Sequence, residues 1–337
     1  MTLCVAWIRQ VGDVEELVFA TDSMLTGGEK WSHGIKLFEL PRKDCLLCFC
    51  GSTGRAYPLI LNLISSIGFE QDFNSAATRI EEILDHISEL FTNLTKEVEK
   101  EVKSENIHEL RGSAKFLFGG WDWQKGIFRV WNLYYSQETE GFVFDEITND
   151  NSMTRFYKFI GDAQIDVEEE AKKRFRKMME EEDLYDKKLD MEPLKVLKNI
   201  SLDANIREVG GSLQIAKVYK SSRTEFFGII WQSSEGVPHF QGRKYDFFKK
   251  PDVRYFNPDN FELIDIDLPQ SITLVDPDIY DGNSDFIKGC YSTKGRPKDD
   301  LTENQRRKLK KIFQEVAYKQ FLYKQLPSEY EKGEEEE

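Results

Sequence analysis

Apolar residues in the first fifty positions occur in short stretches of the kind that form β-strands. Each stretch is too short for a typical helix, and polar or Gly-containing turns separate it from the next. The stretches cover residues 3–9, 16–20, 35–40 and 45–50. We therefore predict that the chain begins with four strands, the first two joined by a turn at Gly12 and Asp13.

Helical spacing replaces the strand pattern after a Gly-Ser-Thr-Gly sequence at residues 51–54. One helix is predicted through residues 57–67, and a longer one follows with apolar residues three and four positions apart. Asn74 and Ser75 are predicted to cap this second helix. Its apolar positions are Ile80, Ile83, Leu84, Ile87, Leu90, Phe91, Leu94, Val98 and Val102.

The middle of the chain continues with strand pairs and helix pairs. These elements are strands at 114–118 and 127–135, helices at 167–179 and 193–204, and strands at 213–219 and 225–231. Helices grouped between runs of strands are typical of layered α+β packing rather than of a doubly wound parallel sheet. The pattern therefore predicts an α+β fold.

The character of the sequence changes after about Val237. Aromatic residues mix there with Asp-Pro and Asn-Pro turns, and a helix is predicted at 301–323 before a Glu-rich stretch at 334–337. We predict one domain over residues 2–236 and an appended mixed region over residues 237–337. The stripe formed by Leu309, Ile312 and Phe313 indicates that the last helix packs against a partner surface.

Charge and hydropathy argue against nucleic acid and membranes as partners. The chain has 46 Lys and Arg against 60 Asp and Glu, a net charge of −14, which would repel a phosphate backbone, so nucleic acid is not an expected partner. No apolar run reaches the roughly 18 to 20 residues of a membrane-spanning helix. The first residues lack the basic region of a signal peptide, which predicts a cytoplasmic protein without a membrane partner.

Cysteine and histidine provide no metal motif. The cysteines number five, an odd count that favours a reducing compartment over a disulfide framework. Cys45 and Cys48 have the spacing of a redox or zinc motif, but no second pair completes it. With Cys50 they are predicted to pack in a buried strand as small apolar residues. Neither a metal nor an organic cofactor is predicted.

Thr2 is the first residue with candidate chemistry. A small second residue permits removal of the initiator Met, which would leave Thr2 with a free α-amine beside its own hydroxyl. An α-amine with a pKa near ~8 can act as a general base close to neutral pH. A terminal Thr therefore combines a nucleophile and a base in one residue.

Three further motifs follow Thr2 in a fixed order. Residues 19–28 read Phe-Ala-Thr-Asp-Ser-Met-Leu-Thr-Gly-Gly, residues 34–38 read Gly-Ile-Lys-Leu-Phe, and residues 48–56 read Cys-Phe-Cys-Gly-Ser-Thr-Gly-Arg-Ala. With the Gly-Trp-Asp sequence that ends at Asp122, this order resembles the proteasome β-subunit family and its bacterial heat-shock relative, which are N-terminal nucleophile hydrolases. The resemblance covers residues 2 to 232. It implies a four-layer αββα sandwich in which Thr2 begins a central strand.

The resemblance also implies catalytic roles for four residues. Thr2 matches the terminal nucleophile, and Asp22 matches the Asp that orients the catalytic Lys and holds the amine. Lys36 matches the Lys whose charge lowers the pKa of the Thr hydroxyl and amine. Gly51 matches the Gly whose backbone N–H stabilises the oxyanion of the tetrahedral intermediate.

Two residues match substrate-binding positions of the family. Thr26 corresponds to the residue that aligns a peptide through backbone hydrogen bonds, and Phe49 lies on the strand that flanks the first specificity pocket. Family members stack into rings, so a homo-oligomer is implied, whereas the sequence identifies neither a ring size nor an unfoldase partner.

The sequence departs from the family pattern at two supporting positions. Asp162 replaces the Ser of a Gly-Ser-Gly segment, and the Arg-Asp segment that supports the amine has no Asp beside Arg207 unless Asp203 takes its place. Asp22 could instead be an ordinary turn residue, and Lys36 could face solvent from an alternating strand.

The preferred interpretation is a threonine-type hydrolase that cleaves peptide bonds. Thr2 would attack the carbonyl, form an acyl ester and release it to water without a cofactor. The alternatives are a non-catalytic scaffold subunit on the same fold, or an amidase that acts on small molecules.

Overall fold

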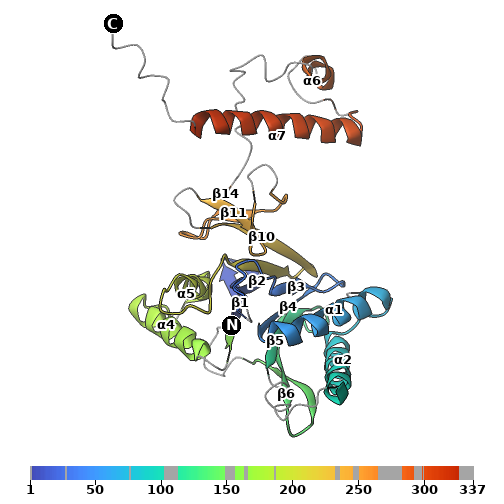
Figure 1. Ribbon diagram of the computed structural model, residues 1–337, viewed down its shortest axis with the longest axis vertical. Coiled ribbons are helices and arrows are strands. Elements are labelled where there is room, and N and C mark those ends of the chain that lie inside the picture. Colours follow the sequence, from blue (N-terminus) through green and yellow to red (C-terminus); the bar gives the residue numbers. More distant parts are fainter. Residues whose placement is uncertain are drawn as a thin grey trace. The chain divides into compact units, whose positions relative to one another are not determined.

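The chain forms two compact units in the computed structural model (Figure 1). Unit 1 comprises Met1–Tyr245 and Lys250–Ile264, and unit 2 comprises Asp246–Lys249 and Asp265–Glu337. The structure describes residues 2–26, 29–75, 77–101, 113–148, 156–162, 166–185, 187–231, 236–245, 250–264, 283–291, 298 and 300–325.

Two β-sheets form the centre of unit 1. The larger has nine strands in the order β12-β11-β10-β9-β2-β1-β8, with β13 paired to β10 and β14 paired to β13. Neighbouring strands are antiparallel except for β10 and β13. Its strands are β1 (Leu3–Val11), β2 (Val14–Thr21), β8 (Tyr157–Gly161), β9 (Gln214–Tyr219), β10 (Arg223–Trp231), β11 (Val237–Phe240), β12 (Arg243–Lys244), β13 (Tyr255–Phe256) and β14 (Leu263–Ile264).

The smaller sheet has five antiparallel strands in the order β3-β4-β5-β6-β7. They are β3 (Leu37–Glu39), β4 (Cys45–Gly51), β5 (Ala114–Asp122), β6 (Ile127–Ser136) and β7 (Gly141–Glu146). The helices of unit 1 are α1 (Thr53–Phe69), α2 (Ile80–Glu101), α4 (Val167–Glu181) and α5 (Glu192–Ser201).

Three apolar cores hold these elements together. One lies between α4, α5 and the larger sheet, a second between α1, α2 and the smaller sheet, and a third between the two sheets. The alternation of a strand explains how β4 serves two cores: Leu47 and Phe49 face the helices, while Leu46 and Cys48 face the other sheet. The predicted α+β class is confirmed.

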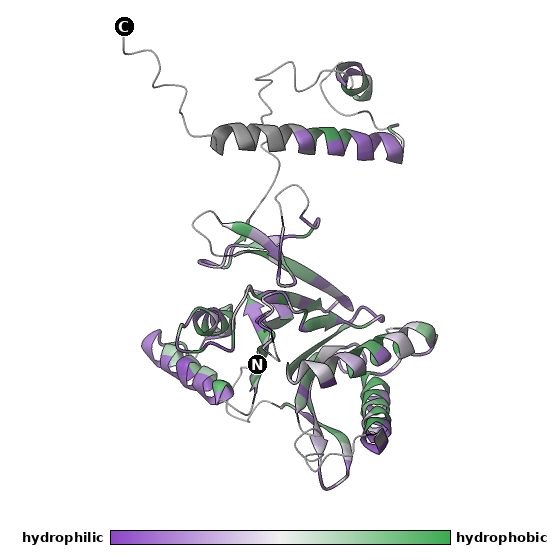
Figure 2. Cartoon of the chain, viewed as in Figure 1, coloured by the Kyte–Doolittle hydropathy of each residue, from purple (hydrophilic) through white to green (hydrophobic). Residues whose placement is uncertain are grey.

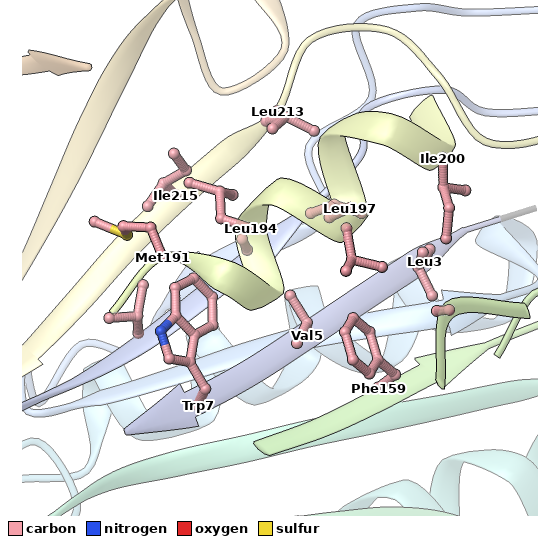
Figure 3. Close-up of a cluster of buried hydrophobic side chains, with 14 of the residues drawn as sticks. Leu3, Val5, Trp7, Phe159, Met191, Leu194, Leu197, Ile200, Leu213 and Ile215 are labelled. Atoms are coloured by element: carbon pink, nitrogen blue, oxygen red, sulfur yellow. The ribbon is translucent and has the colours of Figure 1, made fainter. Parts of the chain in front are cut away.

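The core beneath α5 fixes the start of β1. Leu3, Val5 and Trp7 project from one face of β1 against the apolar side of α5 (Figure 3). The Trp7 indole N–H donates to the Asp190 carbonyl at 2.7 Å, so even the polar atom of this ring is satisfied. These buried side chains anchor the strand that Thr2 precedes.

Helix α4 shows why a strongly charged sequence still forms a packed helix. Its buried side is limited to Val167, Ala171, Phe175 and Met179, which recur at helical spacing. Most of its remaining surface is hydrophilic (Figure 2). Ion pairs between residues three and four apart, such as Arg174 with Glu170, line that side.

The structure differs from the sequence prediction in several elements. Helix α2 begins at Ile80, so Asn74 and Ser75 lie in the turn before it and do not cap it. Strand β3 has only three residues, and Lys36 precedes it rather than lying within it. Strands β7 and β8 were not predicted from the sequence.

The division between the units lies later in the chain than the expected position near Val237. Strands β11 to β14 continue the larger sheet, with Val237 paired to Trp231 and Phe256 paired to Ile229. Tyr255 and Phe256 are buried in unit 1. Cross-strand hydrogen bonding, which composition does not reveal, assigns this segment to the sandwich.

Unit 2 contains α6 (Ser284–Cys290) and α7 (Glu303–Gln325). Leu309 and Ile312 of α7 are buried, and Phe313 contacts the Tyr291 ring with centroids 6.4 Å apart. The predicted packing stripe of this helix therefore has its partner in α6 and the residue after it.

The Glu-rich stretch at 334–337 lies outside the described residues, as do two of the aromatic residues after Val237, Phe247 and Phe248. Within the described part of the chain, no helix is long and apolar enough to cross a membrane.

Candidate active site

Asp22 organises the polar site at the beginning of β1. Its carboxylate accepts hydrogen bonds from the backbone N–H groups of Leu3 at 3.1 Å, Met24 at 3.1 Å and Gly210 at 3.2 Å. The bond from Met24 is the local turn contact considered above, whereas the other two come from distant parts of the chain. Three backbone donors hold this carboxylate in one orientation although it is fully buried.

Lys36 provides the charge that balances Asp22. Its Nζ lies 2.9 Å from Oδ1 and 3.0 Å from Oδ2 of Asp22, and both side chains are fully buried. The alternative in which Lys36 faces solvent is therefore wrong. A buried ammonium is costly to desolvate, and this pairing offsets the cost.

Thr2 immediately precedes Leu3, whose backbone N–H binds this ion pair. The Leu3 N–H that follows it and the Lys36 ammonium donate to the same oxygen of Asp22. Thr2 itself is 1% exposed. The structure therefore brings Asp22, Lys36 and the start of β1 together as the motif order predicts.

Gln214 is a site residue that the sequence analysis missed. Its Oε1 accepts from the backbone N–H of Lys36 at 3.0 Å and of Leu37 at 3.3 Å, while its Nε2 donates to the Gly34 carbonyl at 2.6 Å. One buried amide thus satisfies the backbone N–H groups of Lys36 and Leu37 and the carbonyl of Gly34. The only local signal is a polar residue at the head of an apolar strand.

Gly51 ends β4 at the same end of the sandwich. Its φ is +96°, and a Cβ at this position would lie 2.0 Å from the Ser113 carbonyl oxygen, so only Gly fits. The preceding Cys50 thiol donates to the Gly161 carbonyl at 3.4 Å, and Gly161 is paired with Leu3. Gly51 is thereby held near the beginning of β1.

Phe49 belongs to an aromatic group beside the site. Its ring lies 5.5 Å from the Tyr57 ring and 6.4 Å from the Phe38 ring. Phe49 is fully buried, whereas Phe38 and Tyr57 are partly exposed. The Tyr57 hydroxyl donates to the Ile35 carbonyl at 3.0 Å, which places this group next to Lys36.

Thr26 lies on the loop between Asp22 and Lys36 and is partly exposed. The preceding Leu25 exchanges backbone hydrogen bonds with Trp31 at 2.7 and 3.0 Å. The loop is thus folded on itself, with Thr26 at the start of the segment that the Leu25–Trp31 bridge closes.

Asp203 does not substitute for the missing Asp of the Arg-Asp segment. Its carboxylate accepts from Arg174 at 2.6 Å and from the backbone N–H of Asn205 at 2.9 Å. The hydrogen bond from Arg174 holds the pKa of Asp203 below its ordinary value. Arg207 is exposed, so the second supporting segment of the family pattern is absent here.

The cysteines pack as the strand pattern predicts. Cys4, Cys45, Cys48 and Cys50 are free and buried in β1 and β4. Burial raises the pKa of the Cys45, Cys48 and Cys50 thiols well above the ordinary value, which keeps them protonated and unreactive. Among the described residues, no cluster of three His, Cys, Asp or Glu could hold a metal ion.

The buried Asp22–Lys36 pair places a fixed positive charge near the start of β1. A fixed ammonium with a fully hydrogen-bonded counter-ion stabilises negative charge on a neighbouring oxygen without reorganising. The class defined by the structure is thus an α+β fold of two antiparallel sheets with a buried Asp–Lys pair where its central strand begins.

The solved structures that are similar to this chain include three of Anbu proteins. An Anbu (Gly-1) mutant from Hyphomicrobium sp. strain MC1 is 16% identical over 67% of this chain and 87% of that chain, with a TM-score of 0.43. Anbu, described as an ancestral beta-subunit, from Yersinia bercovieri is 17% identical over 66% and 86% of the two chains, with a TM-score of 0.44. A helical assembly of the Anbu complex from Pseudomonas aeruginosa is 17% identical over 64% and 81%, also with a TM-score of 0.44. No protein-family model and no curated protein matches the chain.

Proposed function

We propose that this protein is a threonine-type amide hydrolase of the proteasome β kind, with a peptide or protein as substrate. The observation that carries the proposal is the shared oxygen of Asp22, which binds both the Lys36 ammonium and the N–H of the residue after Thr2. The proposal requires Thr2 to be the mature N-terminus, because only then does its amine serve as a base.

In the proposed mechanism the Thr2 hydroxyl transfers its proton to the Thr2 amine as its oxygen attacks the substrate carbonyl. Lys36 lowers the energy of the developing negative charge, and the Gly51 N–H would donate to the oxyanion. Collapse of the tetrahedral intermediate breaks the C–N bond, and the amine leaving group takes the proton from the Thr2 ammonium. Water then hydrolyses the acyl ester and regenerates Thr2.

The surroundings of the site support an apolar substrate side chain. Phe38 and Tyr57 present partly exposed rings next to Lys36, with Phe49 packed behind them. Thr26 would align the peptide backbone from the neighbouring loop.

We also propose that the protein is a cytoplasmic homo-oligomer, such as a ring. All five cysteines are free, as expected in a reducing compartment.

Two observations favour a second candidate, a scaffold subunit that has lost activity. Thr2 is 1% exposed, and Asp162 and Arg207 depart from the supporting positions of the family pattern. A scaffold needs the sandwich but not the free amine. A small-molecule amidase would share the Thr2 chemistry, so only substrate profiling separates it from a peptidase.

Trapping of the nucleophile tests the proposal. Intact mass first establishes whether Met1 is removed. A threonine-directed electrophile, such as a peptide epoxyketone, should then label the peptide that begins with Thr2. Thr2→Ala should abolish labelling, Thr2→Ser should retain part of it, and the buried Thr95→Ala should leave it unchanged. Absence of labelling in a protein that has lost Met1 would favour the scaffold.

A further inference from the structure

The loop from Asp22 to Lys36 contacts a later part of the chain as well as the site. Within the loop, the Gly34 N–H donates to the Ser23 carbonyl at 2.8 Å, and the Ser23 hydroxyl donates to the Ser32 carbonyl at 2.7 Å. Asp22 and Lys36 bracket these bonds. Any shift of Ser23 or Gly34 therefore moves the two charged groups of the site.

A first contact on the loop comes from the segment before β9. The Gly210 carbonyl accepts from Ser23 N at 3.1 Å and Met24 N at 2.9 Å. Gly211 has a φ of +74°, and a Cβ there would lie 2.4 Å from the Ser23 hydroxyl oxygen. Ser23 is therefore packed directly against backbone on this side.

A second contact comes from the hairpin of β11 and β12. His239 pairs with Lys244 and Phe240 with Arg243, which leaves Gln241 and Gly242 as a two-residue turn. Both have positive φ, +46° and +82°, as a type I′ turn requires. This turn geometry fixes the conformation of the hairpin tip.

The tip of this hairpin rests on the loop. The His33 Nδ1–H donates to the Gly242 carbonyl at 3.0 Å. A Cβ on Gly242 would lie 2.7 Å from Ser23 Cβ and 3.2 Å from its hydroxyl oxygen. The contact leaves no room for a side chain at position 242, so the Gly242 backbone packs directly against the Ser23 side chain.

We propose that the β11–β12 hairpin is a clamp that positions the loop carrying Asp22 and Lys36, with Gly242 as its positioning residue. Ser23 is held between Gly210–Gly211 on one side and Gly242 on the other. The hairpin lies beyond the part of the chain that carries the family resemblance, so the clamp is an addition to the sandwich. Its effect on catalysis rests on the proposed function of Thr2, whereas its effect on the loop does not.

Gly242→Ala tests the clamp against a matched control. Gly126 also has a positive φ, +66°, but an added Cβ would meet nothing within 4 Å. Both Ala variants carry the same type of backbone strain, and only Gly242→Ala pushes on Ser23. Hydrogen exchange of the Met24 and Gly34 amides should accelerate by about tenfold in Gly242→Ala and stay unchanged in Gly126→Ala.

The rate of Thr2 labelling is the second readout. It should fall by about tenfold or more in Gly242→Ala, because small misplacements of catalytic groups are costly, and remain unchanged in Gly126→Ala. Ser23→Gly removes the atoms that the new methyl group would meet. Adding Gly242→Ala to Ser23→Gly should therefore slow labelling much less than adding it to the wild type.

Several results would overturn the proposal. These are unchanged amide exchange in Gly242→Ala, or an equal loss of labelling in the wild-type and Ser23→Gly backgrounds. If Gly242→Ala fails to fold, His33→Ala removes the bond to Gly242 without backbone strain and should accelerate the same amides. If wild-type Thr2 is never labelled, the proposed function fails, and the exchange experiment still decides on the clamp.

Discussion

Two buried ion pairs in unit 1 look alike but differ in what they connect. Lys36 contacts both carboxylate oxygens of Asp22 at 2.9 and 3.0 Å, and Arg42 contacts both oxygens of Asp44 at 2.6 and 3.0 Å. All four side chains are at most 1% exposed. Burial and geometry alone therefore do not distinguish a functional pair from a structural one.

The partners around each pair make the distinction. Arg42 and Asp44 are two residues apart in the turn between β3 and β4, and Arg42 also donates to the Thr78 carbonyl before α2. Among the described residues, Arg42 Nη1 has no partner. Asp22 instead accepts backbone donors from Leu3 and Gly210, distant positions that meet beside Thr2. The Arg42–Asp44 pair thus joins two turns, whereas the Asp22–Lys36 pair joins segments that are far apart in the sequence.

The largest expected effect comes from removing the cation of each pair in turn. Lys36→Met and Arg42→Met each leave a buried carboxylate without its cation, so each should lower the free energy of unfolding by about 3 to 5 kcal/mol. Only Lys36→Met should slow Thr2 labelling, by on the order of 10²-fold or more. Denaturant unfolding and labelling kinetics on both variants measure the two effects. Equal labelling by the two folded variants would remove the functional distinction.

A smaller effect is expected at Gln214, which binds the backbone N–H of Lys36 rather than its ammonium group. Gln214→Leu leaves the Lys36 and Leu37 N–H groups and the Gly34 carbonyl without this partner, and an unpaired buried group costs about 1 to 3 kcal/mol. Labelling should slow by about tenfold as Lys36 shifts.

Thr224→Val is the control for Gln214→Leu. It removes the hydrogen bond from the hydroxyl of Thr224, which lies in the same sheet as Gln214, to Glu39 of β3. It should lower stability without changing the labelling rate. If both variants slow labelling alike, Gln214 acts through general stability only.

The smallest effect concerns a partly exposed pair, Glu81 with Arg129. Burial opposes ionisation, but hydrogen bonds from Arg129 and Lys125 lower the pKa of Glu81 from 4.5 to about 2. The unfolded chain therefore binds the proton more readily, so the stabilisation is complete above about pH 4.5 and is lost as the pH falls toward 2.

Solvent screening limits this contribution to less than about 1 kcal/mol, because the Glu81 side chain is 31% exposed. Glu81→Gln should reduce the fall in unfolding free energy between pH 5 and pH 2 by that amount, measured by denaturant titration. An unchanged pH dependence would show that the pair contributes nothing measurable, in contrast to the two buried pairs.

Much of the fold follows from local sequence pattern. The apolar stretch of residues 3–9 predicts a strand, and β1 places Leu3, Val5 and Trp7 in one core and Cys4 and Ala6 in another. Helices α1, α2, α4 and α5 follow from apolar spacing. These elements could be predicted because short apolar stretches are typical of buried strands and because burial repeats every three or four residues in a helix.

The candidate site could be predicted only in part. The motif order pointed to Asp22 and Lys36, and the structure brings them together with the start of β1. Gln214 could not be found, because one Gln at the head of a strand has no pattern of its own. Gly242 could not be found for the same reason, because its proposed role depends on its contacts with Ser23 and His33.

The sequence by itself determined most of the helices and the strands of the first fifty residues, and which residues of them are apolar. Only the tertiary structure decided which polar groups meet. Asp22 and Gly210 are 188 positions apart in the chain, yet the Gly210 N–H lies 3.2 Å from the Asp22 carboxylate. Periodicity is a local property, whereas this contact depends on the register of β2 against β9 and on the packing of the two sheets.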